Sequence, residues 1–200
     1  MPAKNDDLHG NVPDDSSAVL IIIDAINDLE FPGGDKLLKF AMPVAENIRR
    51  LKDKLKRAGI SVIYANDNFG KWQADFDAQI NHCLNDNVRG KPLVKLLQPD
   101  EDDYFILKPK QSAFFSTTLD TLLKYLKAKT LILTGLTGDV CVLFTALDAY
   151  QRDFHIFIPN DCVASIEEKD NQLMIQQMER IIKANVQPST DLDIGSLIRN

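Results

Sequence analysis

The chain of 200 residues is 44% hydrophobic and 26% charged, with a formal net charge of -6. This acidic balance argues against nucleic acids and anionic membranes as partners, because both attract basic surfaces, and leaves a small molecule as the expected partner. No apolar run approaches the roughly 18 residues of a membrane-spanning helix. Three cysteines without a CxxC pair suit a reducing compartment, so we expect a cytoplasmic protein.

The alternation of apolar strands and amphipathic helices predicts an α/β fold, with a doubly wound parallel sheet and helices on both faces. We expect a flexible arm at residues 1–16, rich in Asp, Asn, Ser and Pro, and one domain at residues 17–200. In chain order, the expected elements are a strand at 18–23, a helix at about 42–58, a strand at 60–65, an irregular helical stretch at 76–98, a strand at 104–107, a helix at 119–127, a strand at 131–134, a helix carrying Cys141, a strand at 154–158, a helix at 166–184 and a short edge strand at Val186.

Three of the expected strands are followed by residues with useful chemistry: Asp24, Lys108 and Cys141. The carboxyl ends of parallel strands lie along one edge of a sheet, so the three side chains can meet in one cleft. A cysteine at a helix entrance tends toward thiolate, because free N–H groups favour an anion there. Asp24 would accept the thiol proton and Lys108 would hold the thiolate. A buried structural cysteine and solvated strand-end charges are the simpler alternatives.

The same residues belong to segments that resemble the isochorismatase-like cysteine hydrolases, which include nicotinamidases and N-carbamoylsarcosine amidases. The resemblance covers roughly residues 17–187. It is carried by three segments: Ala18-Val-Leu-Ile-Ile-Ile-Asp24, Lys108-Pro-Lys-Gln-Ser-Ala-Phe114 and Gly135-Leu-Thr-Gly-Asp-Val-Cys141.

The resemblance implies a Rossmann-like three-layer fold and a catalytic triad of Asp24, Lys108 and Cys141. It also implies hydrolysis of a small amide or ureido C–N bond through a thioester, without a cofactor. A cis peptide between Leu136 and Thr137 would shape an oxyanion hole, with the N–H groups of Thr137 and Cys141 as donors. Many relatives are oligomers, so a homodimer or homotetramer is expected.

Two departures from the family pattern restrict the substrate. Ile26 and Leu29 stand where the family commonly has Gln and Phe, so an aromatic ring that would stack on a flat substrate is missing. Nicotinamidases bind a metal through an Asp and several His after the second strand, whereas this chain has Asp67 but no His between Asn66 and Asn81. We therefore predict no metal, and nicotinamidase activity is disfavoured.

Candidate substrate contacts come from loops at the same sheet edge. They are Leu29, Asn66, Phe69, Trp72 and Phe115. For the three aromatic residues, a place in the core or at a subunit interface is the alternative.

Three other functions remain open at this stage. Vinyl ether hydrolysis of the isochorismatase type is the runner-up within the family, although true isochorismatases typically lack the cysteine. An oxidoreductase is disfavoured, because Asp24-Ala-Ile-Asn-Asp follows the first strand in place of a glycine-rich phosphate loop. A non-catalytic interaction module on the same fold is the third possibility.

Overall fold

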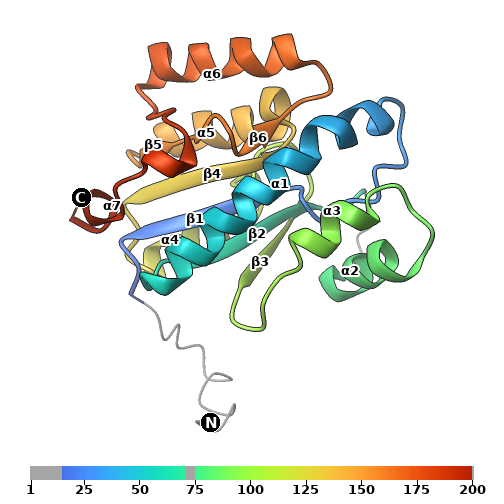
Figure 1. The fold of residues 1–200 in the computed structure, drawn as a ribbon. Helices are drawn as coiled ribbons and strands as arrows, with labels where there is room; N and C mark the ends of the chain where they lie inside the picture. Colours follow the sequence, from blue (N-terminus) through green and yellow to red (C-terminus); the bar gives the residue numbers. More distant parts are fainter. Residues whose placement is uncertain (1–14, 71–74, 200) are drawn as a thin grey trace, which may run out of the picture.

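The structure is a computed structural model that describes residues 15–70 and 75–199, and its centre is a parallel sheet between two layers of helices (Figure 1). Within these residues the sheet has six strands in the order β3-β2-β1-β4-β5, and β6 pairs with β4. All of the strand pairs are parallel. The strands are β1 (Ala18–Ile23), β2 (Ser61–Asp67), β3 (Tyr104–Lys108), β4 (Thr130–Leu136), β5 (His155–Phe157) and β6 (Val163–Ala164).

Strand β1 lies in the middle of the sheet and is buried along its whole length. Leu20 and Ile22 pack into one apolar core, and Val19, Ile21 and Ile23 pack into another on the opposite face. Side chains of a strand alternate between its two faces, so a strand covered on both faces is apolar at every position. The uninterrupted run in the sequence is explained by this double burial.

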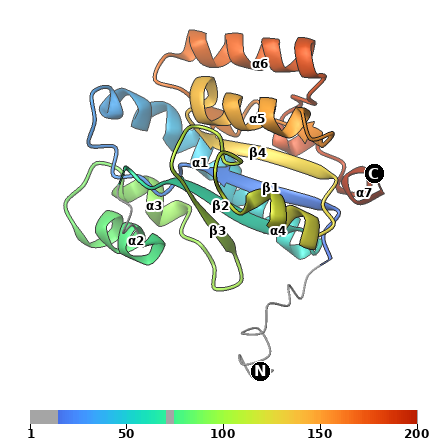
Figure 2. The same cartoon turned by 180° about the vertical axis from the view of Figure 1, so that it is seen from behind.

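The helices form two layers. Helices α1 (Gly34–Arg57), α2 (Phe76–Asn85), α3 (Lys91–Leu96) and α7 (Ile194–Arg199) contribute to the core on the face seen in Figure 1. Helices α4 (Leu119–Tyr125), α5 (Leu143–Tyr150) and α6 (Glu168–Ile182) contribute to the core on the other face, seen in Figure 2. A π-helical turn at Gly138–Val142 precedes α5, and a 3-10 turn lies at Ser189–Asp191. None of the helices in the described ranges is both long and apolar enough to span a membrane.

The predicted α/β architecture is confirmed, but helix α1 is longer than its sequence pattern indicated. It begins at Gly34 rather than near Met42. Leu37 and Ala41 are buried and extend the apolar stripe toward the amino end of the helix, while Pro43 is accommodated inside it. The free energy gained by burying this first part of the helix exceeds the cost of the backbone hydrogen bond that is lost because proline has no N–H.

The last strand of the sheet also differs from expectation. Val186 is not part of a strand, and the adjacent Asn185 makes only an isolated bridge with Phe157. The short strand β6 was not predicted, because two residues are too few to form a recognisable pattern.

The expected amino-terminal arm comprises residues 1–16, of which residues 1–14 lie outside the described residues. Its described end is packed against the domain: Ser16 is buried, and its N–H donates to the carbonyl of Leu126 (2.8 Å). The Ser16 hydroxyl also accepts a hydrogen bond from the N–H of Ser61, at the start of β2 (3.1 Å). Ser16, at the end of the expected arm, is therefore part of the packed domain.

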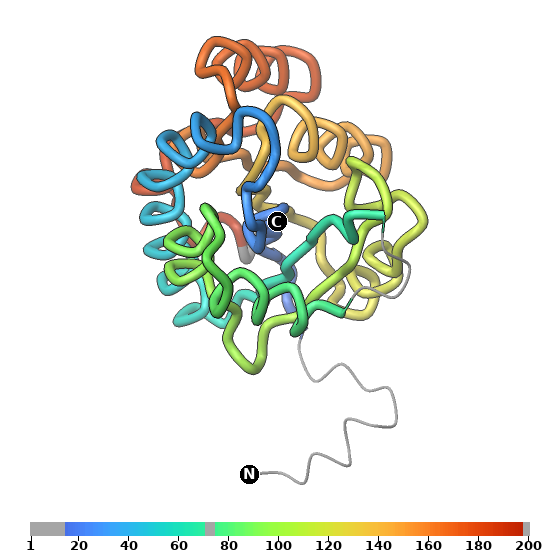
Figure 3. Tube along the Cα trace, turned by 90° about the vertical axis from the view of Figure 1, so that its right-hand side faces the viewer, coloured from blue at the N-terminus to red at the C-terminus, as the bar shows by residue number. Residues whose placement is uncertain are grey.

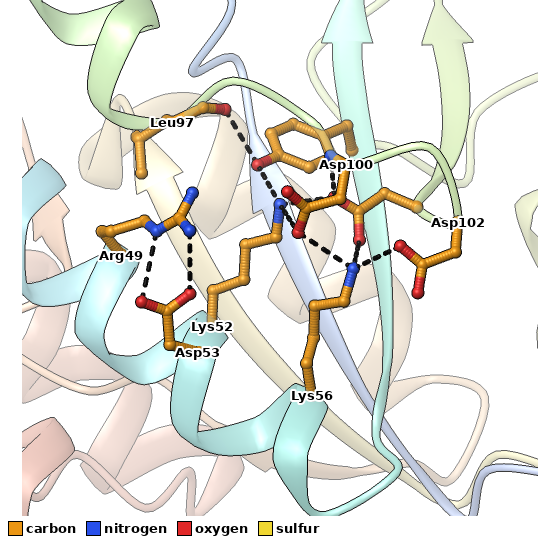
Figure 4. A network of polar contacts seen from close by, with 9 residues as sticks. Arg49, Lys52, Asp53, Lys56, Leu97, Asp100 and Asp102 are labelled. Atoms are coloured by element: carbon orange, nitrogen blue, oxygen red, sulfur yellow. Dashed lines mark hydrogen bonds and ion pairs between the residues drawn. The ribbon is translucent and has the colours of Figure 1, made fainter.

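A buried ionic network joins helix α1 to the loop before β3 (Figure 4). The Lys52 ammonium is fully buried and forms an ion pair with Asp103, whose carboxylate is also buried. Lys52 also contacts Asp100 (3.2 Å) and the hydroxyl of Tyr64 (3.2 Å). Lys56 pairs with the same two carboxylates, at 3.0 Å from Asp100 and 2.9 Å from Asp103. The network lies where β3 begins, at the opposite edge of the sheet from the strand ends that carry Asp24 and Lys108.

We predict that Lys52→Met lowers the free energy of unfolding by about 3 kcal/mol, because it removes a partner of the buried Asp103 carboxylate. Urea unfolding followed by circular dichroism measures this change. Lys36→Met is the matched control, since the Lys36–Glu167 pair is about half exposed and should contribute less than about 1 kcal/mol. Equal losses for the two variants would contradict a structural role for the network.

Candidate active site

Asp24, Lys108 and Cys141 lie at one edge of the sheet, as the topology predicts. Asp24 directly follows β1, Lys108 is the last residue of β3, and Cys141 lies in the π-helical turn after β4. This edge is on the right in Figure 1 and faces the viewer in Figure 3, together with the loop after β1 (blue) and the segment between β2 and α3 (green). Three distant parts of the chain therefore contribute to one site.

The three side chains are in contact. The Lys108 ammonium lies 2.8 Å from Asp24 Oδ2 and 3.6 Å from Cys141 Sγ. The Asp24 carboxylate is close enough to the Cys141 thiol to raise its pKa. Lys108 is fully buried. Its long side chain allows the ammonium to contact Asp24 although strand β2 lies between β3 and β1. The arrangement supplies a thiol, a base and a cation within contact of one another.

Burial dominates the acid–base properties of the site. It raises the pKa of the Asp24 carboxyl, although Lys108 opposes this change. It also raises the pKa of Cys141 to about 12, and the nearby Asp24 carboxylate adds to this effect. Burial would lower the pKa of Lys108, but the negative charges around the ammonium outweigh it and raise that pKa. These shifts favour a protonated Cys141 thiol and a Lys108 ammonium in the resting site. The expected tendency of Cys141 toward thiolate is wrong for this resting state, because burial and the Asp24 charge exceed the effect of the helix entrance.

Backbone contacts from the neighbouring strands fix Asp24. Its N–H donates to the carbonyl of Ala65 (2.9 Å), and its Oδ1 accepts from the N–H of Asp67 (2.7 Å). On the other side β4 passes very close to β1 at Gly135, which has φ 110° and where a Cβ atom would lie 2.1 Å from the carbonyl oxygen of Ile23. Only glycine permits this approach, which sets the distance between the two strand ends.

Hydrogen bonds also tie the segment after β3 to the helix after Cys141. The Thr145 hydroxyl donates to the carbonyl of Cys141 (2.7 Å) and accepts from the N–H of Ala113 (3.0 Å). One turn further on, the Ser112 hydroxyl donates to Asp148 (2.5 Å). These contacts connect two of the three sequence segments that carry the family resemblance, so they hold the lysine and the cysteine at a fixed separation.

A cavity of about 270 Å³ opens onto the Asp24 carboxylate and the Cys141 thiol. Leu29, Phe69, Leu136 and Thr137, four of the residues proposed from the sequence, line it. The peptide bond between Leu136 and Thr137 is cis, which the resemblance implied. Within residues 15–70 and 75–199, the lining is formed by Asp24, Asn27, Leu29, Phe31, Leu37, Asp67, Phe69, Leu136, Thr137, Val140 and Cys141.

Two proposed substrate contacts lie away from this cavity. Asn66 is fully buried, and its amide donates to the carbonyl of Ile26 (2.7 Å). Strand residues alternate between faces, so the next residue, Asp67, lines the cavity instead. Phe115 is about half exposed and is not part of the lining. Trp72 lies outside the described residues.

Sequence analysis missed five lining residues: Asn27, Phe31, Leu37, Asp67 and Val140. Phe31 lies in the loop after β1, and helix α1 brings Leu37 to the cavity because it begins earlier than expected. Recognition of the Gly33–Gly34 pair as a helix start, with Asp35 in the first turn, would have given this signal.

The donor set after β2 does not fit the metal that nicotinamidases bind there. Asp67 is the carboxylate at this position, its Oδ2 lies 3.7 Å from the Lys108 ammonium, and its Oδ1 accepts from the N–H of Phe69 (2.6 Å). A cation at this distance from a potential ligand disfavours a second one. Elsewhere in the described part of the chain, a group of three carboxylates at Asp100, Asp102 and Asp103 is already paired with lysines.

Comparison with known proteins agrees with this fold. The sequence pattern of the isochorismatase domain matches residues 18–190. An uncharacterized isochorismatase family protein of Bacillus subtilis, YaaI, is 41% identical over 84% of this chain and 91% of its own length. The ureidoacrylate amidohydrolase RutB of Methylorubrum extorquens is 29% identical over 70% of this chain and 67% of its own length. The crystal structure of the Bacillus subtilis nicotinamidase/pyrazinamidase PncA superposes with a TM-score of 0.67 at 27% identity, covering 86% of this chain and 99% of that protein.

The fold and the site define a three-layer α/β protein with a cysteine, a lysine and an aspartate at the carboxyl edge of its sheet. The chain belongs to the isochorismatase family. Relatives that are named as amidohydrolases support a hydrolase.

The raised pKa values predict an unusual pH dependence for alkylation of Cys141 by iodoacetamide. The thiolate is the reactive form, and the thiol can pass its proton to Asp24 while that carboxylate is ionised. The wild-type rate should therefore fall at acid pH as Asp24 becomes protonated, and burial places this fall at a higher pH than the ordinary aspartate pKa of 3.8. Between about pH 7 and pH 9 the rate should stay nearly constant. In Asp24→Asn the proton must leave to solvent, so the rate should rise about tenfold per pH unit below the pKa of the thiol.

Peptide mass spectrometry of Cys141 measures these rates. The urea-unfolded protein is the control and should show the titration of an ordinary thiol, at about pH 8.5. A wild-type profile with the same slope as the Asp24→Asn profile would show that Asp24 does not act as the base.

Proposed function

We propose that this chain is a cysteine hydrolase that cleaves a small amide or ureido C–N bond through a thioester on Cys141. The observation that carries the proposal is the contact of the Lys108 ammonium with both Asp24 (2.8 Å) and Cys141 (3.6 Å) beside a cavity. A thiol that touches both a base and a cation can be activated for attack on a carbonyl carbon.

In the first half of the reaction, Asp24 accepts the thiol proton and the Cys141 sulfur forms a bond to the substrate carbonyl carbon. Lys108 stabilises the negative charge during this transfer, because it contacts both the donor and the acceptor. The carbonyl oxygen becomes an oxyanion, for which we propose the N–H groups of Thr137 and Cys141 as donors. Fixed donors of this kind typically contribute about a hundredfold or more to the rate.

The tetrahedral intermediate then collapses with loss of the C–N bond. Protonated Asp24 gives its proton to the departing nitrogen, so ammonia or an amine leaves and the acyl group stays on Cys141. In the second half, Asp24 accepts a proton from water, the resulting hydroxide attacks the thioester, and the proton returns to the sulfur. An amide gives a carboxylic acid, and a ureido compound gives a carbamic acid.

We predict that the purified protein releases ammonia from at least one member of a panel of small amides and ureides. Cys141→Ser, Asp24→Asn and Lys108→Met should each lower kcat/KM by about a thousandfold or more, because the three groups act as a unit. Cys83→Ala is the matched cysteine control and should retain activity, since Cys83 is buried on α2 away from the triad.

Isochorismate belongs in the same panel, because vinyl ether hydrolysis is the alternative within the family. Cleavage of isochorismate, with every amide and ureide untouched and Cys141→Ser fully active, would replace the proposed function by that alternative.

A further inference from the structure

The charged side chains described in the lining of the cavity beside Cys141 are acidic. Among the residues that the structure describes, its ionisable lining groups besides the thiol are the carboxyls of Asp24 and Asp67. No lysine, arginine or histidine is present among the described residues that line it. Lys108 lies beneath the lining, fully buried, and is engaged with Asp24, Cys141 and the carbonyl of Lys110 (3.2 Å).

Nearby cations are also held by other groups. Arg89 pairs with Glu30 (3.5 Å) and donates to the carbonyl of Leu29 (2.6 Å). His82 contacts Asp28 and Asp86. In the described part of this sheet edge, these cations are therefore already neutralised by neighbouring carboxylates, and a carboxylate on a substrate would gain little from them.

Asp67 is the carboxylate in the cavity lining that has no role in the proposed reaction. Its side chain is 35% exposed, whereas that of Asp24 is 8% exposed. Asp67 Oδ1 accepts from the N–H of Phe69, but Oδ2 lies at 3.7 Å from Lys108, beyond hydrogen-bonding distance. Oδ2 thus keeps the capacity to accept hydrogen bonds from a bound molecule.

The remaining lining is largely apolar. Leu29, Phe31, Leu37, Leu136 and Val140 contribute side chains to it. Such walls favour a compact apolar body and give no compensation for the lost hydration of an anion.

We infer that the site selects uncharged or cationic substrates with an apolar body, and that Asp67 sets this selection by accepting hydrogen bonds from a substrate N–H group and by repelling carboxylates. The inference rests on the proposed function for the identity of the reaction, and it adds the charge class of the substrate. Asp67 is a specificity-determining residue in this account and takes no part in proton transfer.

Alkylthiolation of Cys141 tests the inference without a substrate. Three methanethiosulfonates of similar size serve as probes: aminoethyl (cationic), sulfonatoethyl (anionic) and propyl (neutral). Each rate at Cys141 is divided by the rate at the same cysteine in the urea-unfolded protein, which removes the intrinsic reactivity of the probe. Cationic and neutral probes should then react at least about tenfold faster than the anionic probe, because the carboxylates of Asp24 and Asp67 outnumber the single Lys108 ammonium beside a poorly hydrated cavity.

Asp67→Asn is the decisive variant. Asn can still accept a hydrogen bond from the N–H of Phe69, so the local turn is retained. The ratio of cationic to anionic rates should fall by about tenfold in this variant. Asp77→Asn, on the exposed first turn of α2, changes the net charge equally and should leave the ratio unchanged. An anion preference in the wild type, or equal effects of the two variants, would overturn the inference.

The outcomes for the reaction and for the charge class can be separated. If no amide or ureide is hydrolysed but the probes show selectivity that depends on Asp67, the proposed function fails alone. If hydrolysis occurs but carboxylate-bearing amides are preferred to uncharged amides of equal length, the charge inference fails alone.

Discussion

The buried ion pair between Lys108 and Asp24 is the interaction on which the site depends. A fully buried ammonium without a counterion would cost several kcal/mol, so Asp24 must lie in contact with it. Asp24 is fixed in turn by the N–H of Asp67 at the end of the neighbouring strand β2. The register of β1, β2 and β3 therefore sets the position of the acid–base pair, and β4 brings Cys141 to it.

This arrangement reconciles a protonated resting thiol with nucleophilic chemistry. A thiol whose pKa is raised to about 12 is protonated in the resting site at neutral pH, so little free thiolate is present before proton transfer to Asp24. Burial also raises the pKa of Asp24, which makes this carboxylate a stronger base than an exposed one. Lys108 contacts both groups, so negative charge is stabilised on either side of the proton transfer. In the proposed reaction, the thiolate forms only as the substrate is attacked.

The fold and the three central residues could be predicted from the sequence, because doubly buried strands are uninterrupted apolar runs and their ends share one edge. The lining of the cavity could be predicted only in part. The predicted strand ended at residue 65, two residues before the end of β2, and sequence analysis selected Asn66, which faces the core, in place of Asp67, which faces the cavity. The resting state of Cys141 was also missed, because burial and the adjacent carboxylate depend on tertiary contacts that no local pattern encodes.

Trapping of the covalent intermediate tests the central claim most directly. The protein would be mixed with an amide or ureide that it hydrolyses, quenched with acid within one turnover and digested for mass spectrometry. The account predicts the mass of the acyl or carbamoyl group on the peptide that contains Cys141, and its absence from Cys141→Ser. Turnover with Cys141 unmodified throughout the first cycle, or unchanged turnover by Cys141→Ser, would contradict a thioester mechanism.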